Sequence, residues 1–143
     1  VLGICFSTAM HSLLAVDAEG NALTNALLWS DNRAQAQVAA NRDWGQQIYP
    51  QTGLPFHPMS PLAKLLWLCQ TQPDLFAKAY KFVSLKEYIL FHLTGKWVID
   101  WSMAGATGLF DLHTRTWLPT ALEAVGLLPE QLSIPVSPFY PLL

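Results

Sequence analysis

Charged residues are scarce in this sequence. They make up 13% of its 143 residues, whereas 52% are hydrophobic, and average soluble chains carry about twice that share of charge. So little charge does not cover the surface of an isolated globule. We therefore expect part of the apolar surface to contact another part of a larger protein or a second subunit. The sequence also lacks an initiating Met and opens within an apolar run, which indicates a segment of a longer chain.

Basic runs and long apolar runs are missing as well. The net charge is −2, and six tryptophans without a basic run are typical of core and interface positions, not of a nucleic-acid surface. No stretch approaches the ~20 apolar residues of a membrane-spanning helix. We therefore expect neither nucleic acid nor a membrane as a partner. The two cysteines, Cys5 and Cys69, lie in an apolar run and on an apolar helix face, which predicts buried thiols in a reducing, cytoplasmic environment.

Reaction machinery is sparse. The sequence contains no G-x-x-x-x-G-K-[ST] or G-x-G-x-x-G phosphate loop and no G-x-S-x-G nucleophile elbow. The four histidines do not pair with the cysteines at metal-ligand spacings, so no metal site is expected. These histidines are His11, His57, His92 and His113.

Apolar runs and turn signals in the first half predict strands over 1–6, 12–16 and 23–29, the last two joined by a turn over 17–21. A helix is expected over 32–49, followed by a Pro/Gly loop. Ser60 and Pro61 are typical of the N-cap and first residue of a helix. Lys64, in the first turn of that helix, opposes the helix dipole, and it is interpreted as a solvated surface lysine.

The second half of the sequence also contains both helix and strand patterns. Helices are expected over 74–80, 86–93 and 116–125, and strands over 97–99 and 109–112. The run 100–108 is rich in small residues, which allow a backbone or a ligand to approach closely. The segment 129–143 is rich in proline, and no further element is expected there. The pattern as a whole predicts an α/β fold.

The stretch 26–33, A-L-L-W-S-D-N-R, is the most informative. It predicts a buried strand that ends at Trp29 and presents polar groups at its edge, where ligands bind in open α/β sheets. The alternative is that Ser30, Asp31 or Asn32 only caps the next helix. Together with His11, His57 and Met59, these side chains suit a polyhydroxylated ligand, and Arg33 suits a carboxylate.

Seven short motifs occur in a distinctive order. They are A-M-H-S at 9–12, L-L-W-S-D-N-R at 27–33, T-G-L-P-F-H-P-M-S-P at 52–61, K-L-L-W-L at 64–68, S-L-K-E-Y at 84–88, L-T-G at 93–95 and the small-residue run 102–110. Together they resemble the FGGY family of carbohydrate kinases, up to about residue 132. Their spelling is most similar to gluconate kinases, since xylulose kinases usually have Q-M-H-G and W-N-D where this sequence has A-M-H-S and W-S-D. Thr71 departs from the family's helix signature.

The resemblance implies a partial actin-like (RNase H-like) ATPase domain of α/β class, a sheet with flanking helices that lacks its first hairpin and its second domain. Residues 1–143 would be part of the N-terminal domain, with a divergent tail over 133–143. The implied activity is ATP-dependent phosphorylation of gluconate or a related sugar or sugar acid, with another family substrate such as xylulose as the alternative. ATP and Mg²⁺ are implied as cofactors of the full-length family. Substrate contacts in relatives correspond to Met10, His11, Trp29, Asp31 and Met59, with Arg33 just behind them.

Two parts that the family uses do not occur in this sequence. One is the D-x-G-T phosphate-binding hairpin, expected before Val1, and the other is a Gly-rich G-D-x segment with the catalytic Asp, expected after Leu143. We therefore expect no catalytic residue, no good binding of ATP and no kinase activity in this chain alone. The expected partners are a small sugar or sugar acid and the remainder of the kinase or a second subunit. A non-catalytic sugar-binding or interaction remnant is an alternative, and a domain without a ligand is another.

Overall fold

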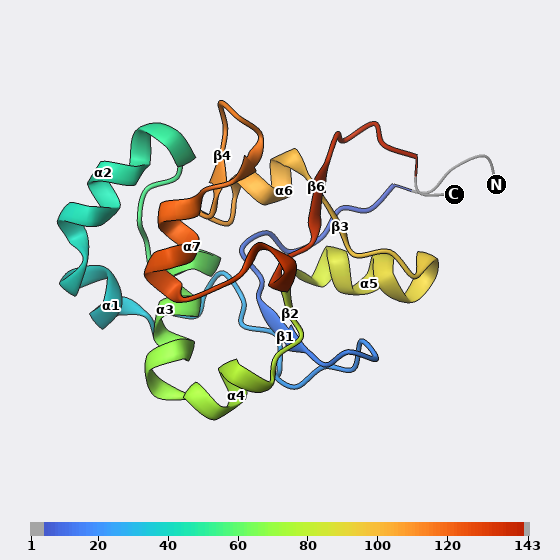
Figure 1. Ribbon diagram of the computed structural model, residues 1–143, viewed down its shortest axis with the longest axis horizontal. Helices are drawn as coiled ribbons and strands as arrows, with labels where there is room; N and C mark the ends of the chain where they lie inside the picture. The colour runs from blue at the N-terminus through green and yellow to red at the C-terminus, as the bar shows by residue number, and fades with distance from the viewer. Residues whose placement is uncertain (1–4, 142–143) are drawn as a thin grey trace.

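The computed structural model describes residues 5–141 of the chain, an α/β arrangement in which helices surround short strands (Figure 1). The helices are α1 (Gln35–Ala40), α2 (Arg42–Thr52), α3 (Pro61–Thr71), α4 (Pro73–Lys78), α5 (Leu85–Thr94), α6 (Trp101–Gly105), α7 (Pro119–Val125) and the 3₁₀ turn η1 (Pro129–Gln131). No helix within 5–141 is long and apolar enough to span a membrane. The predicted α/β class is confirmed.

The strands form three separate pairs. β1 (Leu14–Val16) pairs antiparallel with β2 (Lys81–Val83), β3 (Val98–Asp100) pairs parallel with β6 (Ile134–Val136), and β4 (Phe110–Asp111) pairs antiparallel with β5 (Thr116–Trp117). Each described strand therefore has one strand partner, and the sheet with flanking helices that the family resemblance implied is present here as three short pairs.

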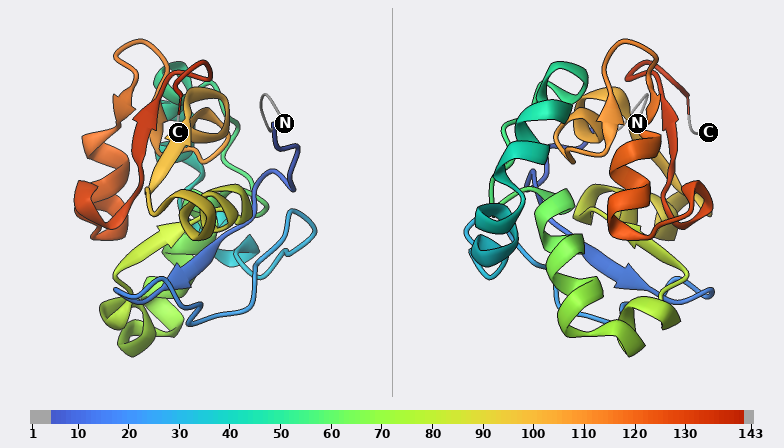
Figure 2. Two further views of the ribbon diagram at one scale, coloured as in Figure 1. Left: turned by 90° about the vertical axis from the view of Figure 1, so that its right-hand side faces the viewer. Right: turned by 60° about the vertical axis from the view of Figure 1, so that its left-hand side comes forward.

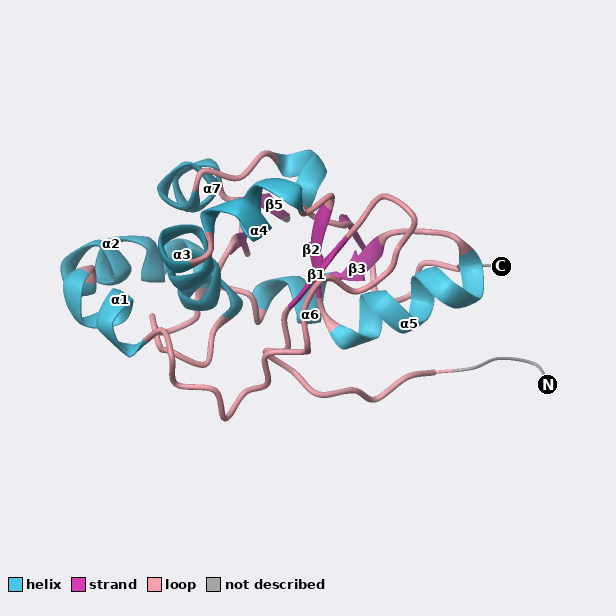
Figure 3. Cartoon of the chain, turned by 90° about the horizontal axis from the view of Figure 1, so that it is seen from below, coloured by secondary structure: helices cyan, strands magenta, loops and turns pink. Residues whose placement is uncertain are grey.

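Helix α3 is the centre of the core. Ser60 begins it as predicted, because its hydroxyl accepts a hydrogen bond from Ala63 N at 3.3 Å and Pro61 occupies the first turn. Seven of its eleven residues are buried: Pro61, Leu62, Ala63, Lys64, Leu65, Leu66 and Leu68. Its leucines pack with residues of α7 and of the β1–β2 pair, and α1 covers its other side (Figure 3). A helix buried this completely provides a rigid support for the loops at its N-terminal end.

The β1–β2 pair is covered on both faces. Successive side chains of a strand point to opposite faces, and the two faces contribute to two different clusters. The face toward α3 carries Leu13, Ala15 and Phe82. The face toward α5 carries Leu14, Val16 and Val83. This double burial explains why residues 13–16 are uninterruptedly apolar, and Figure 2 shows the pair between helices on either side.

The turn after β1 has the predicted glycine, but the returning strand expected over 23–29 does not form. Gly20 has φ +87°, and a Cβ there would lie 2.2 Å from the Phe91 ring. Beyond the turn only isolated bridges form, such as Leu13–Leu27. The cause is Thr24, whose hydroxyl accepts the hydrogen bond of Ala15 N at 3.1 Å in place of a backbone carbonyl, so the ladder is interrupted.

Three further boundaries differ from the prediction. The helix expected over 32–49 is two helices, which break at Asn41, where the backbone N–H and the side-chain amide both donate to the Gln37 carbonyl. The helix expected over 116–125 begins at Pro119, because Thr116 and Trp117 pair with β4 instead. The segment after 129 was expected to hold no element, yet β6 pairs with β3 there. The sequence pattern contained no signal for the long-range pairing of β3 with β6.

The two cysteines are less buried than predicted. Cys5 is exposed and Cys69 is half-buried on α3. Burial raises the pKa of the Cys69 thiol. Both cysteines are free thiols.

Helix α5 begins with a capping box that encloses a buried carboxyl group. Ser84 N donates to Glu87 Oε2 at 2.6 Å, and Glu87 N donates to Ser84 Oγ at 3.3 Å. Glu87 is 4% exposed. Burial raises the pKa of Glu87 above its usual value, and the hydrogen bonds with Ser84 offset only part of that increase.

We expect Glu87→Gln to change how the stability of the chain depends on pH. Because the pKa of Glu87 is raised in the fold, the unfolded chain releases this proton at lower pH, and the free energy of unfolding falls as pH rises from the usual carboxyl pKa through the raised one. Glutamine keeps a carbonyl acceptor for Ser84 N but has no proton to lose. Urea unfolding at several pH values should therefore show the wild type losing stability relative to Glu87→Gln as pH rises.

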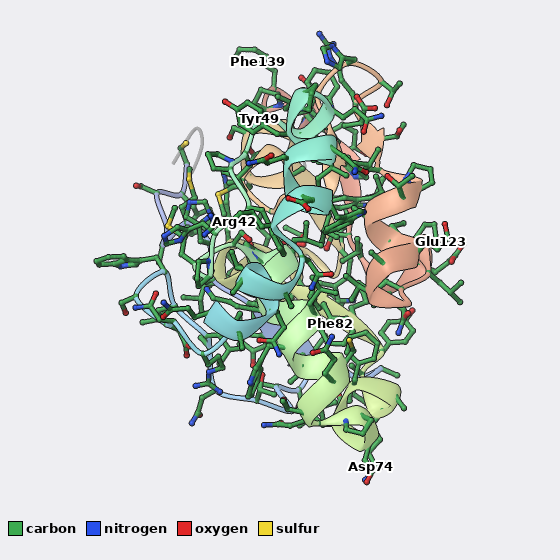
Figure 4. The ribbon with its side chains drawn as sticks, turned by 90° about the vertical axis from the view of Figure 1, so that its left-hand side faces the viewer. Arg42, Tyr49, Asp74, Phe82, Glu123 and Phe139 are labelled. Carbon is green, nitrogen blue, oxygen red and sulfur yellow. The ribbon has the colours of Figure 1, made fainter. Side chains whose placement is uncertain are left out.

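Glu123→Gln is the matched control, since Glu123 projects outward from α7 (Figure 4). The stability of Glu123→Gln should depend on pH in the same way as that of the wild type. Parallel curves for Glu87→Gln and the wild type would contradict the role of the buried carboxyl group.

Candidate functional site

The predicted site residues come from three segments that meet at the N-terminal end of α3. Lys64, in the first turn of α3, donates from Nζ to the His11 carbonyl at 2.6 Å and to the Leu28 carbonyl at 2.7 Å. Met59 lies immediately before the N-cap of the same helix. One ammonium group therefore brings together the segments that contain Met10 and His11, Trp29 to Arg33, and Met59.

Lys64 has no exposed surface, so the interpretation as a solvated surface lysine is wrong. A buried ammonium needs polar partners, and the two carbonyls provide them. Burial lowers the pKa of Lys64 to about 8, although the charge of Asp31 acts in the opposite direction and raises it. The sequence did contain a signal that Lys64 is not an ordinary surface residue, because a cation in the first turn of a helix opposes the helix dipole.

His11 is held from two sides. Its backbone has φ +59°, a left-handed conformation that is uncommon outside glycine. Its ring Nδ1 lies 2.9 Å from the carbonyl of Ala106. Because a carbonyl only accepts, Nδ1 carries the proton and Nε2 is the remaining acceptor of the neutral ring. Within the described part of the chain Nε2 has no hydrogen-bond partner, so it is available to a hydroxyl group.

The turn that carries Met10 is fixed by Ser12. The Ser12 hydroxyl donates to the carbonyl of Ala9 at 2.9 Å and accepts from Leu85 N at 3.0 Å. Met10 is 47% exposed on this turn. The turn is therefore anchored to the start of α5 while its apolar side chain stays accessible.

Asp31 and Arg33 form a close ion pair. Arg33 Nε lies 2.8 and 2.9 Å from the two carboxylate oxygens of Asp31, and Nη2 lies 2.8 Å from Oδ2. The guanidinium also stacks over the Trp67 ring at 4.7 Å. Burial alone would raise the pKa of Asp31, but the hydrogen bonds and charge of Arg33 and the charge of Lys64 outweigh it and lower that pKa. Asp31 is therefore an ionised acceptor that Arg33 holds in place.

Neither Asp31 nor Asn32 caps the following helix. The N-cap of α1 is Ala34, which makes no side-chain hydrogen bond to the helix. The Asp31 carboxylate instead accepts from Arg33 N at 3.1 Å, within its own turn. The capping alternative is therefore wrong for these two residues.

The apolar residues before Asp31 are largely exposed, so the prediction of a buried strand ending at Trp29 is wrong. Leu27 is buried, whereas Leu28 is 40% exposed and Trp29 is 62% exposed. Trp29 lies two residues before Asp31, and its exposed indole has a flat apolar face that suits the C–H face of a sugar.

The segment before α3 is a turn organised by His57. Its carbonyl accepts from Ser60 N at 2.9 Å and from Ser60 Oγ at 2.8 Å, and its Nδ1 accepts from Met59 N at 3.2 Å. A cavity of about 310 Å³ adjoins this turn. It is lined by Asn32, Gln35, Val38, Ala39, Arg42, His57 and Pro58. Arg42 was not among the predicted site residues, because the helix break that exposes it at the start of α2 was not foreseen.

Within 5–141 no group of three or more His, Cys, Asp or Glu side chains is arranged to hold a metal. The sequence contains no glycine-rich phosphate loop. No step of phosphoryl transfer is therefore assigned to these side chains.

Comparison with known proteins identifies relatives of this chain. The model of the N-terminal domain of the FGGY family of carbohydrate kinases matches residues 1–137. Gluconokinases of Bacillus licheniformis and Bacillus subtilis are 39% identical over 132 residues, which are 91% of this chain and 26% of each relative. A xylulose kinase of Staphylococcus xylosus is 32% identical over 130 residues. The chain thus spans about a quarter of the length of these relatives.

Solved structures agree with these relatives. A gluconate kinase from Lactobacillus acidophilus superposes with a TM-score of 0.91 at 41% identity, covering 96% of this chain and 28% of that structure. A ligand-bound xylulose kinase from the same organism gives the same values. The fold is therefore that of the N-terminal domain of these kinases. The chain resembles the gluconate kinase structure and the xylulose kinase structure equally closely.

We expect Arg33→Met to raise the pKa of the Asp31 carboxyl. The substitution removes the side-chain hydrogen bonds and the charge of Arg33, which lower this pKa. It leaves in place the partial burial that raises the pKa, together with the backbone hydrogen bond and the Lys64 charge. Carboxyl ¹³C NMR titration measures the change directly. Arg42→Met is the control, because Arg42 makes no ion pair with Asp31 among the described residues. An unchanged titration of Asp31 in Arg33→Met would refute this account of the ion pair.

Proposed function

We propose that this chain, which belongs to the FGGY family of carbohydrate kinases, binds the sugar substrate of such a kinase at the N-terminal end of α3. The observation that carries the proposal is the Lys64 ammonium, which brings His11 and the segment before Asp31 to one place. These are residues that the family resemblance had assigned to substrate contact. The chain spans about a quarter of its relatives, so the activity of a whole kinase is itself part of the proposal.

The proposed contacts follow from the hydrogen-bonding capacity of each group. The ionised Asp31 carboxylate accepts from sugar hydroxyls, and such charge-assisted hydrogen bonds are the stronger kind. His11 Nε2 accepts from a further hydroxyl. Trp29 lies against the C–H face of the sugar, and Met10 and Met59 border it. Arg33 acts behind these residues by keeping Asp31 ionised and oriented.

We favour gluconate as the substrate. The gluconokinases are 39% identical to this chain, against 32% for the xylulose kinase. The cavity beside the Met59 turn contains Arg42 and His57, and a cationic side chain there suits the carboxylate of a sugar acid. Xylulose is the second candidate, because the xylulose kinase structure resembles this chain as closely as the gluconate kinase structure does.

Phosphoryl transfer is assigned to residues outside this chain. Such transfer depends on positioning and on charge stabilisation around the phosphates and Mg²⁺. The sequence contains no glycine-rich phosphate loop, and no metal-binding cluster occurs within residues 5–141. In this proposal the remainder of the kinase binds ATP, and this chain binds and orients the sugar. The 143-residue chain alone therefore binds the sugar without phosphorylating it.

Calorimetry with D-gluconate and D-xylulose tests the proposal. We expect gluconate to bind, and Asp31→Asn to weaken binding by about 10-fold or more, since a hydrogen bond to a charged group contributes about 1.5–3 kcal/mol. Asp74→Asn is the matched control, because Asp74 is an exposed carboxylate in the first turn of α4 (Figure 4). The affinity of Asp74→Asn should equal that of the wild type.

The same preparation is then assayed with ATP and Mg²⁺. We expect no gluconate phosphorylation above a control without protein. Equal affinities of Asp31→Asn and the wild type would count against the site, and phosphorylation by the chain alone would count against the division of roles.

A further inference from the structure

We infer that Lys64 is a positioning residue of the sugar site: without touching the ligand, its ammonium fixes the backbone of His11 and of the segment from Leu28 to Asp31 in the arrangement that binds sugar. The inference rests on the proposed function for the identity of the ligand. The arrangement of the two segments is a property of the chain itself and is tested separately below.

Burial determines how Lys64 can act. The residue has no exposed surface, so its Nζ does not reach a ligand at the site's outer edge. Its two hydrogen-bond acceptors are backbone carbonyls, one from each of two site segments, at 2.6 and 2.7 Å. These carbonyls lie 53 and 36 residues away along the chain. Lys64 therefore acts on the site through main-chain positions.

The carbonyls lie where the strand pairing has ended. Leu13 and Leu27 exchange two backbone hydrogen bonds of 2.9 Å and form the bridge nearest to the site. Beyond this bridge, His11 and Leu28 direct their carbonyls to Lys64. Two carbonyl oxygens that converge without a donor repel each other, so the ammonium is what allows the segments to approach each other here.

The two functional side chains depend on these carbonyls. The His11 backbone is in the left-handed region, which persists only when its surroundings impose it, and Lys64 and Ala106 are the contacts that hold this residue. The Leu28 carbonyl also accepts from Asp31 N at 3.0 Å. Loss of the Lys64 ammonium would therefore release the His11 backbone and loosen the turn that presents Asp31.

This geometry predicts a pH dependence of affinity. Burial lowers the pKa of Lys64 to about 8, and the charged groups that act on it are Asp31, which raises the pKa, and Arg33, which lowers it. Helix α1 has no ionisable side chain. The ionisable side chains of the other two helices packed against α3 do not contribute: Asp74, Lys78 and Glu123. As pH rises through 8 the ammonium loses its charge, its hold on the two carbonyls weakens, and sugar affinity falls.

Stability changes in the opposite direction. Between about pH 8 and the ordinary lysine pKa near 10.4, the unfolded chain binds more protons at this position than the folded chain. The contribution of Lys64 to the free energy of unfolding therefore rises with pH. If Lys64 were purely structural, a rise in pH would change the stability of the chain but not its affinity for sugar. If Lys64 is a positioning residue, the same rise in pH lowers the affinity for sugar while the contribution of Lys64 to stability increases.

Lys81 provides a matched control. It is also buried, at 9% exposure, and its Nζ donates to the carbonyls of Glu130 at 2.6 Å and Leu132 at 3.1 Å. Burial lowers its pKa as well. Its acceptors belong to η1 and the residue after it, neither of which contributes to the candidate site. Lys81→Met thus removes a similar interaction from elsewhere in the fold.

Calorimetry with D-gluconate compares Lys64→Met, Lys81→Met and the wild type at pH 6.5 and 9, with urea unfolding to establish that each protein is folded. We expect Lys64→Met to bind at least 10-fold more weakly at pH 6.5 and Lys81→Met within twofold of the wild type. Wild-type affinity should fall about fivefold or more between the two pH values, and Lys64→Met should lack this decrease. Equal losses in both variants, or undiminished binding by Lys64→Met, would overturn the inference.

A second measurement needs neither a variant nor a ligand. In side-chain NMR of the wild-type lysines, we expect the Lys64 amine to titrate near pH 8. The His11 ring signals and the Asp31 amide signal should shift with the same midpoint pH. If the wild type binds no sugar but these midpoints coincide, the proposed function fails and the positioning role stands. If the His11 and Asp31 signals do not respond to the Lys64 titration, the positioning role is refuted whatever the ligand.

Discussion

The buried ammonium of Lys64 is the interaction on which the candidate site depends. An ammonium without exposed surface is costly unless it is hydrogen-bonded, and both of its acceptors come from segments distant in sequence. The fold is therefore stable only when those segments are in place. Helix α3 makes this constraint effective, because its leucines form the centre of the core and hold the lysine in a fixed position.

Local signals predicted the elements that local interactions determine. The start of α3 followed from Ser60 and Pro61. The strand expected over 23–29 failed because Thr24 replaces a backbone acceptor, which no periodicity reveals. The α/β class could be predicted from the alternation of patterns, whereas the pairing of β3 with β6 depends on contacts across more than 30 residues.

The sequence named the residues of the candidate site, but it did not predict how they are arranged. His11 and Asp31 stood out as polar residues at breaks in apolar runs, and the family resemblance gave them a role. Lys64 was interpreted as a surface residue because lysine is rarely fully buried, and Trp29 was interpreted as buried because it ends an apolar run. The structure reverses both, with the lysine inside and the tryptophan 62% exposed. The exposed apolar residues beside Asp31 also fit the low charge of the chain.

The central claim is that this chain binds a sugar at the N-terminal end of α3. Amide and side-chain NMR of the wild type during titration with D-gluconate tests it most directly, because every segment is observed at once. The account predicts saturable shifts concentrated in residues 9–12, 28–33 and 57–60, including the Trp29 indole and the His11 ring. Saturable shifts centred elsewhere, for example on β4 and β5, or no saturable shifts at all, would contradict it.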